Sequence, residues 1–126
     1  MEKSAIQTAS APAAIGPYSQ AIKCGSLVFC SGQVPIDPKT GEVVRGTIED
    51  ETRRVMENVK ALLDAAGATL GHVVKTTIFL KNMGDFQRVN EVYASFFKPP
   101  FPARSTVEVA RLPRDVNIEI ECIANV

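Results

Sequence analysis

The chain has 126 residues, which is enough for one domain with a single hydrophobic core and too short for a separate cofactor domain, so residues 1–126 are expected to form one domain. Hydrophobic residues make up 45% and charged residues 22%, a balance typical of globular rather than disordered proteins. The 14 Lys and Arg equal the 14 Asp and Glu in number, so the formal net charge is zero and binding to a nucleic-acid backbone is disfavoured.

The cysteines and the histidine exclude several kinds of chemistry. Cys24, Cys30 and Cys122 have no C-x-x-C spacing, and His72 is the single histidine, so neither a zinc site nor a Ser-His-Asp triad is expected. The glycines form no dinucleotide or phosphate motif, so the sequence predicts no metal and no cofactor. Without an N-terminal signal pattern or an 18-residue apolar run, a cytoplasmic protein that does not enter the membrane is expected.

The first third predicts strands and turns. Small residues, Pro12 and Gly16-Pro17 favour extended and turning backbone over residues 1–22. Residues 27–30 read as a buried strand, followed by a second short apolar run at 34–36. Residues 37–41 then predict a turn because proline presets φ and glycine ends the segment, and 42–44 are expected to return as a strand.

The middle of the chain predicts two helices separated by a strand. From Thr47 the apolar period becomes 3.6, which indicates an amphipathic helix capped by Thr47 and closed by Gly67. Residues 73–80 are apolar on both faces and predict an interior strand. A second helix begins near Asp85 and ends before Pro99. Its apolar stripe comprises Phe86, Val89, Asn90, Tyr93, Phe96 and Phe97. The Asn90 carboxamide therefore either satisfies a backbone end or reaches a ligand pocket.

The last third predicts two strands around a turn at residues 112–115. Strict alternation places Arg104, Thr106 and Glu108 on one face of the first strand. In the second strand, alternation sets an apolar face apart from a polar one, which carries Glu119 and Glu121. A simple hairpin would bring Arg104, Glu108, Glu119 and Glu121 to one face. Such a face is either a solvated surface or a site in which the arginine compensates the carboxylates.

The order of these elements predicts an α+β fold in which two helices pack on one face of a mostly antiparallel sheet. The other face, carrying Thr76, Ile78 and Leu80 or their neighbours, would remain uncovered. An uncovered face of this kind favours docking between identical copies, so an oligomer is expected.

Three segments carry a resemblance to a known family. They are APAAIGPYSQ at residues 11–20, SGQVP at 31–35 and FPARSTVEVARLP at 101–113. They resemble the Rid, or YjgF-like, family and within it the RidA subgroup, from about the tenth residue to the end. The resemblance implies a chorismate-mutase-like α+β protomer and a homotrimer with a central β-barrel and clefts between neighbouring subunits. It also implies catalysis without cofactor or metal.

The resemblance further implies an activity and a set of site residues. RidA proteins hydrolyse reactive 2-imino acids, chiefly 2-iminobutanoate and 2-iminopropanoate, to 2-oxo acids and ammonia. Arg104 matches the arginine that grips the substrate carboxylate, and Glu119 matches the carboxylate that positions water, with Glu121 as its competitor by alternation. The residues implied to bind substrate are Tyr18, Ser31, Gly32, Asn90, Arg104 and Thr106. By the resemblance, Tyr18 closes over the ligand, and Ser31 and Gly32 offer hydrogen-bond donors. Thr106 stands where many RidA members have a cysteine.

Other functions remain open. Some proteins of this family have been described as RNA-cleaving translation inhibitors or as chaperone-like, and the same cleft would also suit a binder that retains a 2-oxo acid without turnover. Net neutrality and the lack of a basic, aromatic stripe weigh against RNA. A chaperone-like role would require a sizeable exposed apolar patch.

Overall fold

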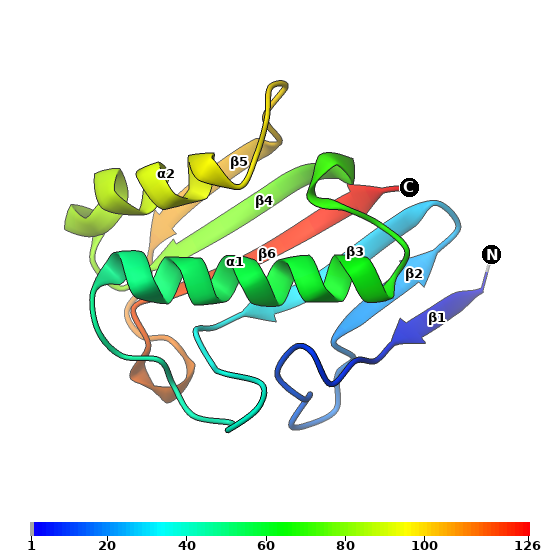
Figure 1. Ribbon diagram of the computed structural model, residues 1–126, viewed down its shortest axis with the longest axis horizontal. Helices are drawn as coiled ribbons and strands as arrows, with labels where there is room; N and C mark the ends of the chain where they lie inside the picture. The colour runs from blue at the N-terminus through cyan, green and yellow to red at the C-terminus, as the bar shows by residue number, and fades with distance from the viewer. Residues whose placement is uncertain (1) are drawn as a thin grey trace.

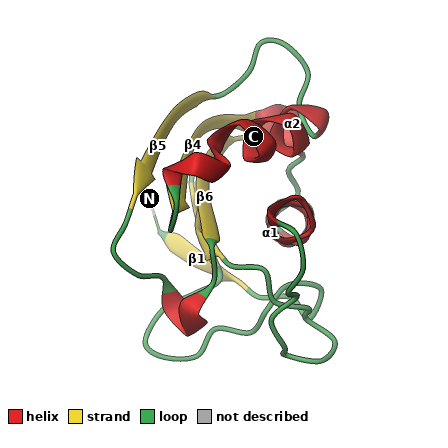
Figure 2. Cartoon of the chain, turned by 90° about the vertical axis from the view of Figure 1, so that its left-hand side faces the viewer, coloured by secondary structure: helices red, strands yellow, loops and turns green. Residues whose placement is uncertain are grey.

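The computed structural model describes residues 2–126 as two layers, with both long helices on one face of a single curved sheet (Figures 1 and 2). The strands are β1 (Lys3–Ile6), β2 (Ala21–Cys24), β3 (Leu27–Gln33), β4 (Val73–Leu80), β5 (Ala103–Glu108) and β6 (Ile118–Asn125). The helices are α1 (Ile48–Ala65) and α2 (Phe86–Ser95), with short 3₁₀ turns at Leu70–His72, Met83–Asp85 and Pro113–Asp115. The predicted α+β class, with helices on one face, is confirmed.

Helix α1 follows directly from its sequence. The Thr47 hydroxyl accepts the Asp50 N–H at 3.1 Å, and the Asp50 carboxylate accepts the Thr47 N–H at 3.4 Å, so both ends of a capping box are present. Gly67 lies just beyond the helix with φ +78°, a conformation that side chains resist. The predicted apolar stripe is buried over the sheet, with Val55, Leu62 and the other core-facing residues of the helix. The predicted cap and helix end are therefore confirmed.

The sheet has the order β1-β2-β3-β6-β4-β5. All neighbours are antiparallel except β4 and β5, which run parallel. The predicted hairpin is wrong, because β4 lies between β5 and β6. The chain leaves β5, passes the turn at Pro113–Asp115 and returns on the far side of β4. The segments 34–36 and 42–44, predicted as strands, form an isolated β-bridge between Ile36 and Val43 instead.

The structure decides between the two sets of β4 residues that the sequence offered for the uncovered face. Thr76, Ile78 and Leu80 are buried under the helices, so they do not lie on the uncovered face. Their neighbours in β4 occupy that face instead. Because β4 is apolar on both faces, its periodicity did not distinguish them.

Cys30 and Cys122 are paired across β3 and β6 and are buried; a hydrogen bond between the two thiols and burial raise the pKa of Cys122.

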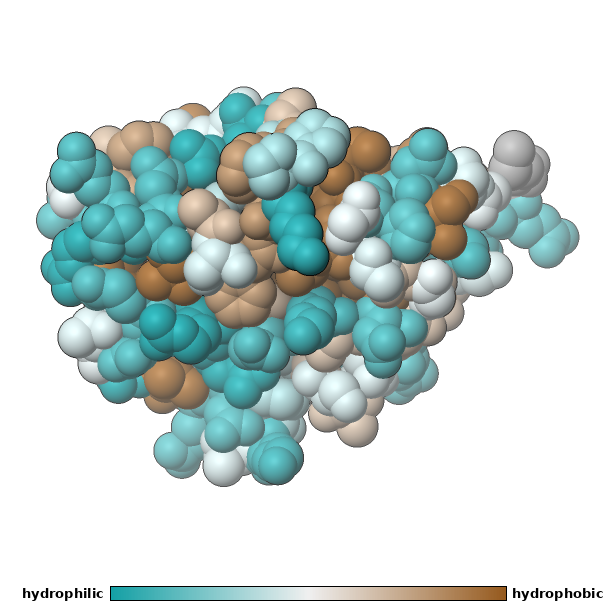
Figure 3. All heavy atoms as spheres, turned by 45° about the horizontal axis from the view of Figure 1, so that its top comes forward, coloured by the Kyte–Doolittle hydropathy of each residue, from teal (hydrophilic) through white to brown (hydrophobic). Residues whose placement is uncertain are grey.

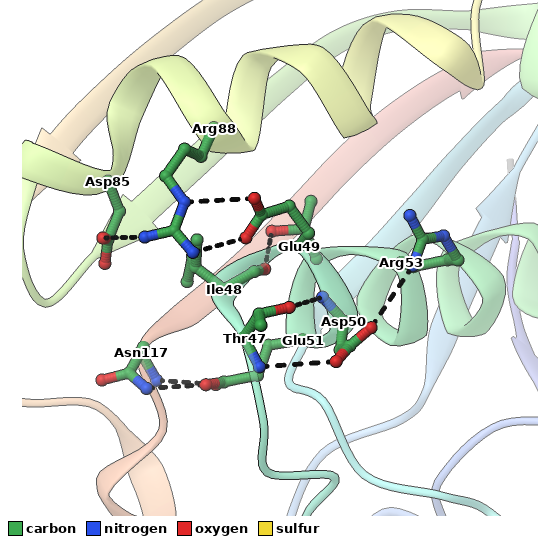
Figure 4. Close-up of polar contacts among 10 residues, drawn as sticks. Thr47, Ile48, Glu49, Asp50, Glu51, Arg53, Asp85, Arg88 and Asn117 are labelled. Atoms are coloured by element: carbon green, nitrogen blue, oxygen red, sulfur yellow. Dashed lines mark hydrogen bonds and ion pairs between the residues drawn. The ribbon is translucent and has the colours of Figure 1, made fainter.

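Polar contacts at the start of α1 tie three elements together (Figure 4). Arg88 of α2 donates to both carboxylate oxygens of Glu49 in α1, at 2.7 and 3.1 Å. The buried Glu51 accepts the Asn117 backbone N–H at 3.2 Å and its side-chain amide at 2.7 Å. Since Asn117 immediately precedes β6, this buried carboxylate anchors the start of the strand that carries Glu119.

Candidate functional site

Arg104 lies on the helix-facing side of β5, next to α2. Its guanidinium donates to the carboxamide oxygen of Asn90 at 2.8 Å. This contact favours the second alternative for Asn90, since its oxygen turns toward a charged pocket. The pocket has a volume of about 390 Å³ and is lined by Asn90, Tyr93, Ala94, Phe101, Pro102 and Arg104. Among residues 2–126 Arg104 forms no ion pair, so a guanidinium with an unneutralised charge faces this pocket.

Two aromatic rings of α2 support the Arg104 guanidinium. Its central carbon lies 5.4 Å from the centre of the Phe86 ring and 5.1 Å from that of Tyr93, distances at which a cation is attracted to a ring face. The Tyr93 hydroxyl is bonded to that of Thr76 at 2.7 Å in the core. Burial raises the Tyr93 pKa, which keeps the hydroxyl protonated. These rings and Asn90 restrict the orientation of the guanidinium.

Thr106 follows Arg104 by two residues and lies on the same side of β5. Its hydroxyl oxygen is buried and has no hydrogen-bond partner among the residues that the structure describes. A buried hydroxyl without a partner costs about 1–3 kcal/mol. The hydroxyl is therefore free to bond a ligand that reaches this part of the strand.

Glu119 lies on the opposite, uncovered face of the sheet. It is opposite Phe79 in β4, and its carboxylate lies directly over Gly32 of β3. A Cβ placed on Gly32 would lie 2.7 Å from the carboxylate carbon of Glu119 and 3.0 Å from its Cγ. A Cβ at this position would displace the carboxylate, so Gly32 of the SGQVP segment and Glu119 form one structural unit.

The environment of Glu119 shifts its protonation. Partial burial, and secondarily the negative charge of Glu121, raise the pKa of the Glu119 carboxyl above its ordinary value. A raised pKa makes the carboxylate a better proton acceptor near neutral pH. Glu121 is exposed, whereas Glu119 is half-buried.

Ser31 directly precedes Gly32 in β3 and is bonded to the loop that carries Tyr18. The Ser31 N–H donates to the Gln20 carbonyl at 3.0 Å, and its hydroxyl donates to the Ser19 carbonyl at 2.6 Å. Both donors of Ser31 are thus engaged in holding the loop that carries Tyr18, and its hydroxyl is left to act only as an acceptor. Tyr18 itself is exposed and adjoins a separate hollow in the N-terminal loop.

The structure divides the predicted site into two groups within one chain. The arginine half comprises Asn90, Arg104 and Thr106, and the glutamate half comprises Gly32 and Glu119, with Ser31 next to Gly32 in β3. Tyr18 lines the separate hollow of the N-terminal loop, so the structure does not place it in either half. The prediction that Arg104 and Glu108 share a face with Glu119 and Glu121 is wrong, because inserting β4 puts the two pairs on opposite faces of the sheet.

Three supporting residues were missed from the sequence. Phe86 and Tyr93 were assigned only to the apolar stripe, although their spacing with Asn90 by i, i+4 and i+7 places all three on one helix face toward β5. Gln20 is buried, and its carboxamide bonds the backbone of Thr8, Ala11 and Pro12. No sequence pattern signals that role, because the contacts are specific to the folded loop.

Within residues 2–126, no group of three or more His, Cys, Asp or Glu side chains is placed to hold a metal ion. None of the helices in this part of the chain has the length and apolar character needed to cross a membrane.

The fold and these side chains define an α+β protein that presents an arginine without an ion pair among residues 2–126 on one face of its sheet and a glutamate with a raised pKa on the other. The family described as Endoribonuclease L-PSP matches residues 8–126. The chain is 55% identical over 122 residues to the 2-iminobutanoate/2-iminopropanoate deaminase of Salmonella typhimurium, covering 94% of each chain.

Solved structures agree with this match. The fold superimposes on RidA from an Antarctic Psychrobacter with a TM-score of 0.94 at 44% identity, covering 98% of this chain and 99% of that one. It superimposes on Escherichia coli TdcF with bound serine with a TM-score of 0.94 at 48% identity, covering 98% of both chains. The chain belongs to the Rid (YjgF-like, Endoribonuclease L-PSP) family, as its three motif segments predicted.

Proposed function

We propose that this protein hydrolyses 2-imino acids, including 2-iminobutanoate and 2-iminopropanoate, to 2-oxo acids and ammonia. The observation that carries the proposal is the Arg104 guanidinium, which is oriented by Asn90 and two rings and is not neutralised by any carboxylate among residues 2–126. A guanidinium in this state matches a small carboxylate ligand bidentately. The identity to a relative named as such a deaminase supports the same reaction.

The chemistry needs an oriented water molecule and a proton acceptor. Arg104 binds the substrate carboxylate, and Thr106 bonds a substrate oxygen or nitrogen. As the water oxygen bonds to C2, the C=N electron pair moves to nitrogen and Glu119 takes the proton that water loses. With the substrate as the iminium ion, Glu119 then returns this proton to the amine nitrogen of the carbinolamine. The C–N bond breaks as the hydroxyl oxygen forms the C=O bond, and the hydroxyl proton passes through water to the departing ammonia, which leaves as ammonium.

The working site requires two copies of the chain. Arg104 and Glu119 lie on opposite faces of one sheet, so neither can act on a ligand held by the other in the same chain. The face that carries Glu119 also exposes apolar side chains that suit an interface, with Leu27 at 38%, Phe29 at 42% and Val107 at 42% exposure. We propose a homotrimer whose sheets form a central barrel and whose clefts join the glutamate half of one subunit to the arginine half of its neighbour.

The test of the residue roles is hydrolysis of 2-iminobutanoate generated in the assay from threonine by a dehydratase. Arg104→Ala is expected to raise KM steeply, since the carboxylate loses its partner. Glu119→Gln is expected to lower kcat, since the amide cannot accept a proton. Unchanged rates in Arg104→Ala would refute the carboxylate role, and unchanged rates in Glu119→Gln would refute the proton-acceptor role. Ligand binding without turnover in the wild type would identify a binder rather than an enzyme.

Mixing the two variants, each of which is expected to be impaired, tests the shared site. If the protein is unfolded and refolded as an equal mixture of Arg104→Ala and Glu119→Gln, about one quarter of the clefts receive both an intact arginine and an intact glutamate. About a quarter of the wild-type activity is therefore expected, whereas a site within one chain would regain none. Sedimentation of the wild type as a monomer at the assay concentration would also contradict the proposal.

A further inference from the structure

A larger hollow lies on the helix side of the molecule, away from Glu119. It is a groove of about 780 Å³ between α1 and the linker at residues 96–102 that joins α2 to β5. Figure 3 shows apolar surface between hydrophilic side chains on this side of the molecule. Its apolar lining includes Ala61, Leu70, Val73, Phe96, Phe97 and Pro102. The volume is in the range of small-molecule sites, about 300–1,000 Å³.

The rim of this groove carries charges of both signs. Glu57, Lys60 and Asp64 come from α1, and Lys98 comes from the linker. All four are exposed, and within residues 2–126 none of them forms an ion pair. The two cations and two anions carry no net charge, so a ligand with a single charge is attracted by two of these groups and repelled by the other two. A ligand with an ammonium and a carboxylate at one end of an apolar body satisfies both signs.

We infer that the groove is a second ligand site, which takes a hydrophobic α-amino acid. The apolar side chain of the ligand packs on Phe96, Phe97 and Leu70, its carboxylate pairs with the lysines, and its ammonium pairs with the acids. The site differs from the Arg104 pocket in its residues and in its chemistry, and shares with it only Pro102. It goes beyond the proposed deaminase activity and does not require it.

The groove is nevertheless in contact with the residues that hold Arg104. The Phe97 ring, which lines the groove, lies 4.8 Å from the Tyr93 ring at an interplanar angle of 44°. The chain has two tyrosines and no tryptophan, so the ring signals of Tyr93 are readily assigned by NMR. A ligand that packs on Phe97 is expected to shift these signals.

The experiment measures binding of L-phenylalanine to the full chain by calorimetry and by the NMR shift of Tyr93. Lys60→Glu and Lys98→Glu should each weaken binding about fivefold, and Lys39→Glu, an exposed lysine outside the groove, should not. Ala61→Trp should abolish binding by filling the groove. Circular dichroism and thermal unfolding verify that each variant is folded. If Ala61→Trp does not fold, the two lysine variants still decide the test.

Two further results separate this site from the deaminase site and define the ligand. Binding and the Tyr93 shift should persist in Arg104→Ala, whatever that variant does to imine hydrolysis; their loss would overturn the proposal. 3-Phenylpropionate, which lacks the ammonium, and 2-phenylethylamine, which lacks the carboxylate, should each bind several-fold more weakly than phenylalanine. Equal binding of all three compounds, or of the wild type and both lysine variants, would refute a zwitterion site, as would the absence of binding to the wild type.

Discussion

Replacing Gly32 with alanine tests the contact that positions the Glu119 carboxylate. The added Cβ would lie 2.7 Å from the carboxylate carbon of Glu119, whereas two carbon atoms separate comfortably at about 3.5–4.0 Å. The carboxylate must therefore withdraw by about 1 Å. A misplacement of this size costs about 100-fold in rate, so Gly32→Ala is expected to lower kcat/KM for 2-iminobutanoate about 100-fold.

The folded state should tolerate the same substitution. The atoms that must move lie at the end of a flexible side chain, and Gly32 has no φ in the left-handed region, so the change in the free energy of unfolding should stay within about 1 kcal/mol. Gly71→Ala is the matched control, because a Cβ at that position meets only the Thr69 hydroxyl, at 3.4 Å. The control should retain wild-type activity.

A double mutant decides whether the loss acts through Glu119. If Gly32→Ala works by displacing this carboxylate, then adding it to Glu119→Gln should cost almost nothing further, since the two changes remove the same group. Denaturant unfolding and imine hydrolysis are measured on all four proteins of the cycle. Wild-type activity in Gly32→Ala, or losses that multiply in the double mutant, would refute the positional reasoning.

Three other outcomes follow from the structure. Tyr93→Phe keeps the ring beside Arg104 but leaves the buried Thr76 hydroxyl without its partner. Chemical denaturation should therefore show a loss of about 1–3 kcal/mol in the free energy of unfolding, with KM nearly unchanged. Tyr93→Leu, which removes the ring, should raise KM up to about tenfold. Because the Glu119 pKa is raised, kcat should fall as pH drops through a value above that of an ordinary glutamate, and a kcat profile still falling there in Glu119→Gln would contradict the assignment. Gln20→Leu removes a buried carboxamide that bonds the backbone of three residues of the N-terminal loop, and it should lower the unfolding free energy by about 2 kcal/mol in the same denaturation assay. Unchanged stability would show that these bonds do not hold the loop.

The raised pKa of Glu119 also has a consequence for stability with a definite sign. The folded protein binds this proton more tightly than the unfolded chain, so this carboxyl makes folding less favourable as pH rises from the unfolded pKa through the raised folded pKa. Above that window the cost is fully present. Glu119→Gln should therefore be as stable as the wild type or more so at neutral pH, even though its kcat should be lower.

Local sequence determined most of the individual elements. The Thr47 cap and Gly67 define the ends of α1, the 3.6 period defines the buried faces of both helices, and strict alternation defines the buried face of β6. These features depend on residues within a turn or two of one another. The three motif segments identified the family, and with it the residues of the candidate site, without any knowledge of where they lie.

Tertiary structure alone decided which strands are neighbours and hence which site residues meet. Alternation shows which residues share one face of a strand, but strand order depends on burial between segments far apart in the chain. Strand β4 buries Thr76, Ile78 and Leu80 under the helices and lies between β5 and β6, where it separates Arg104 from Glu119. The support of Arg104 by Phe86 and Tyr93 likewise exists only once α2 packs beside β5.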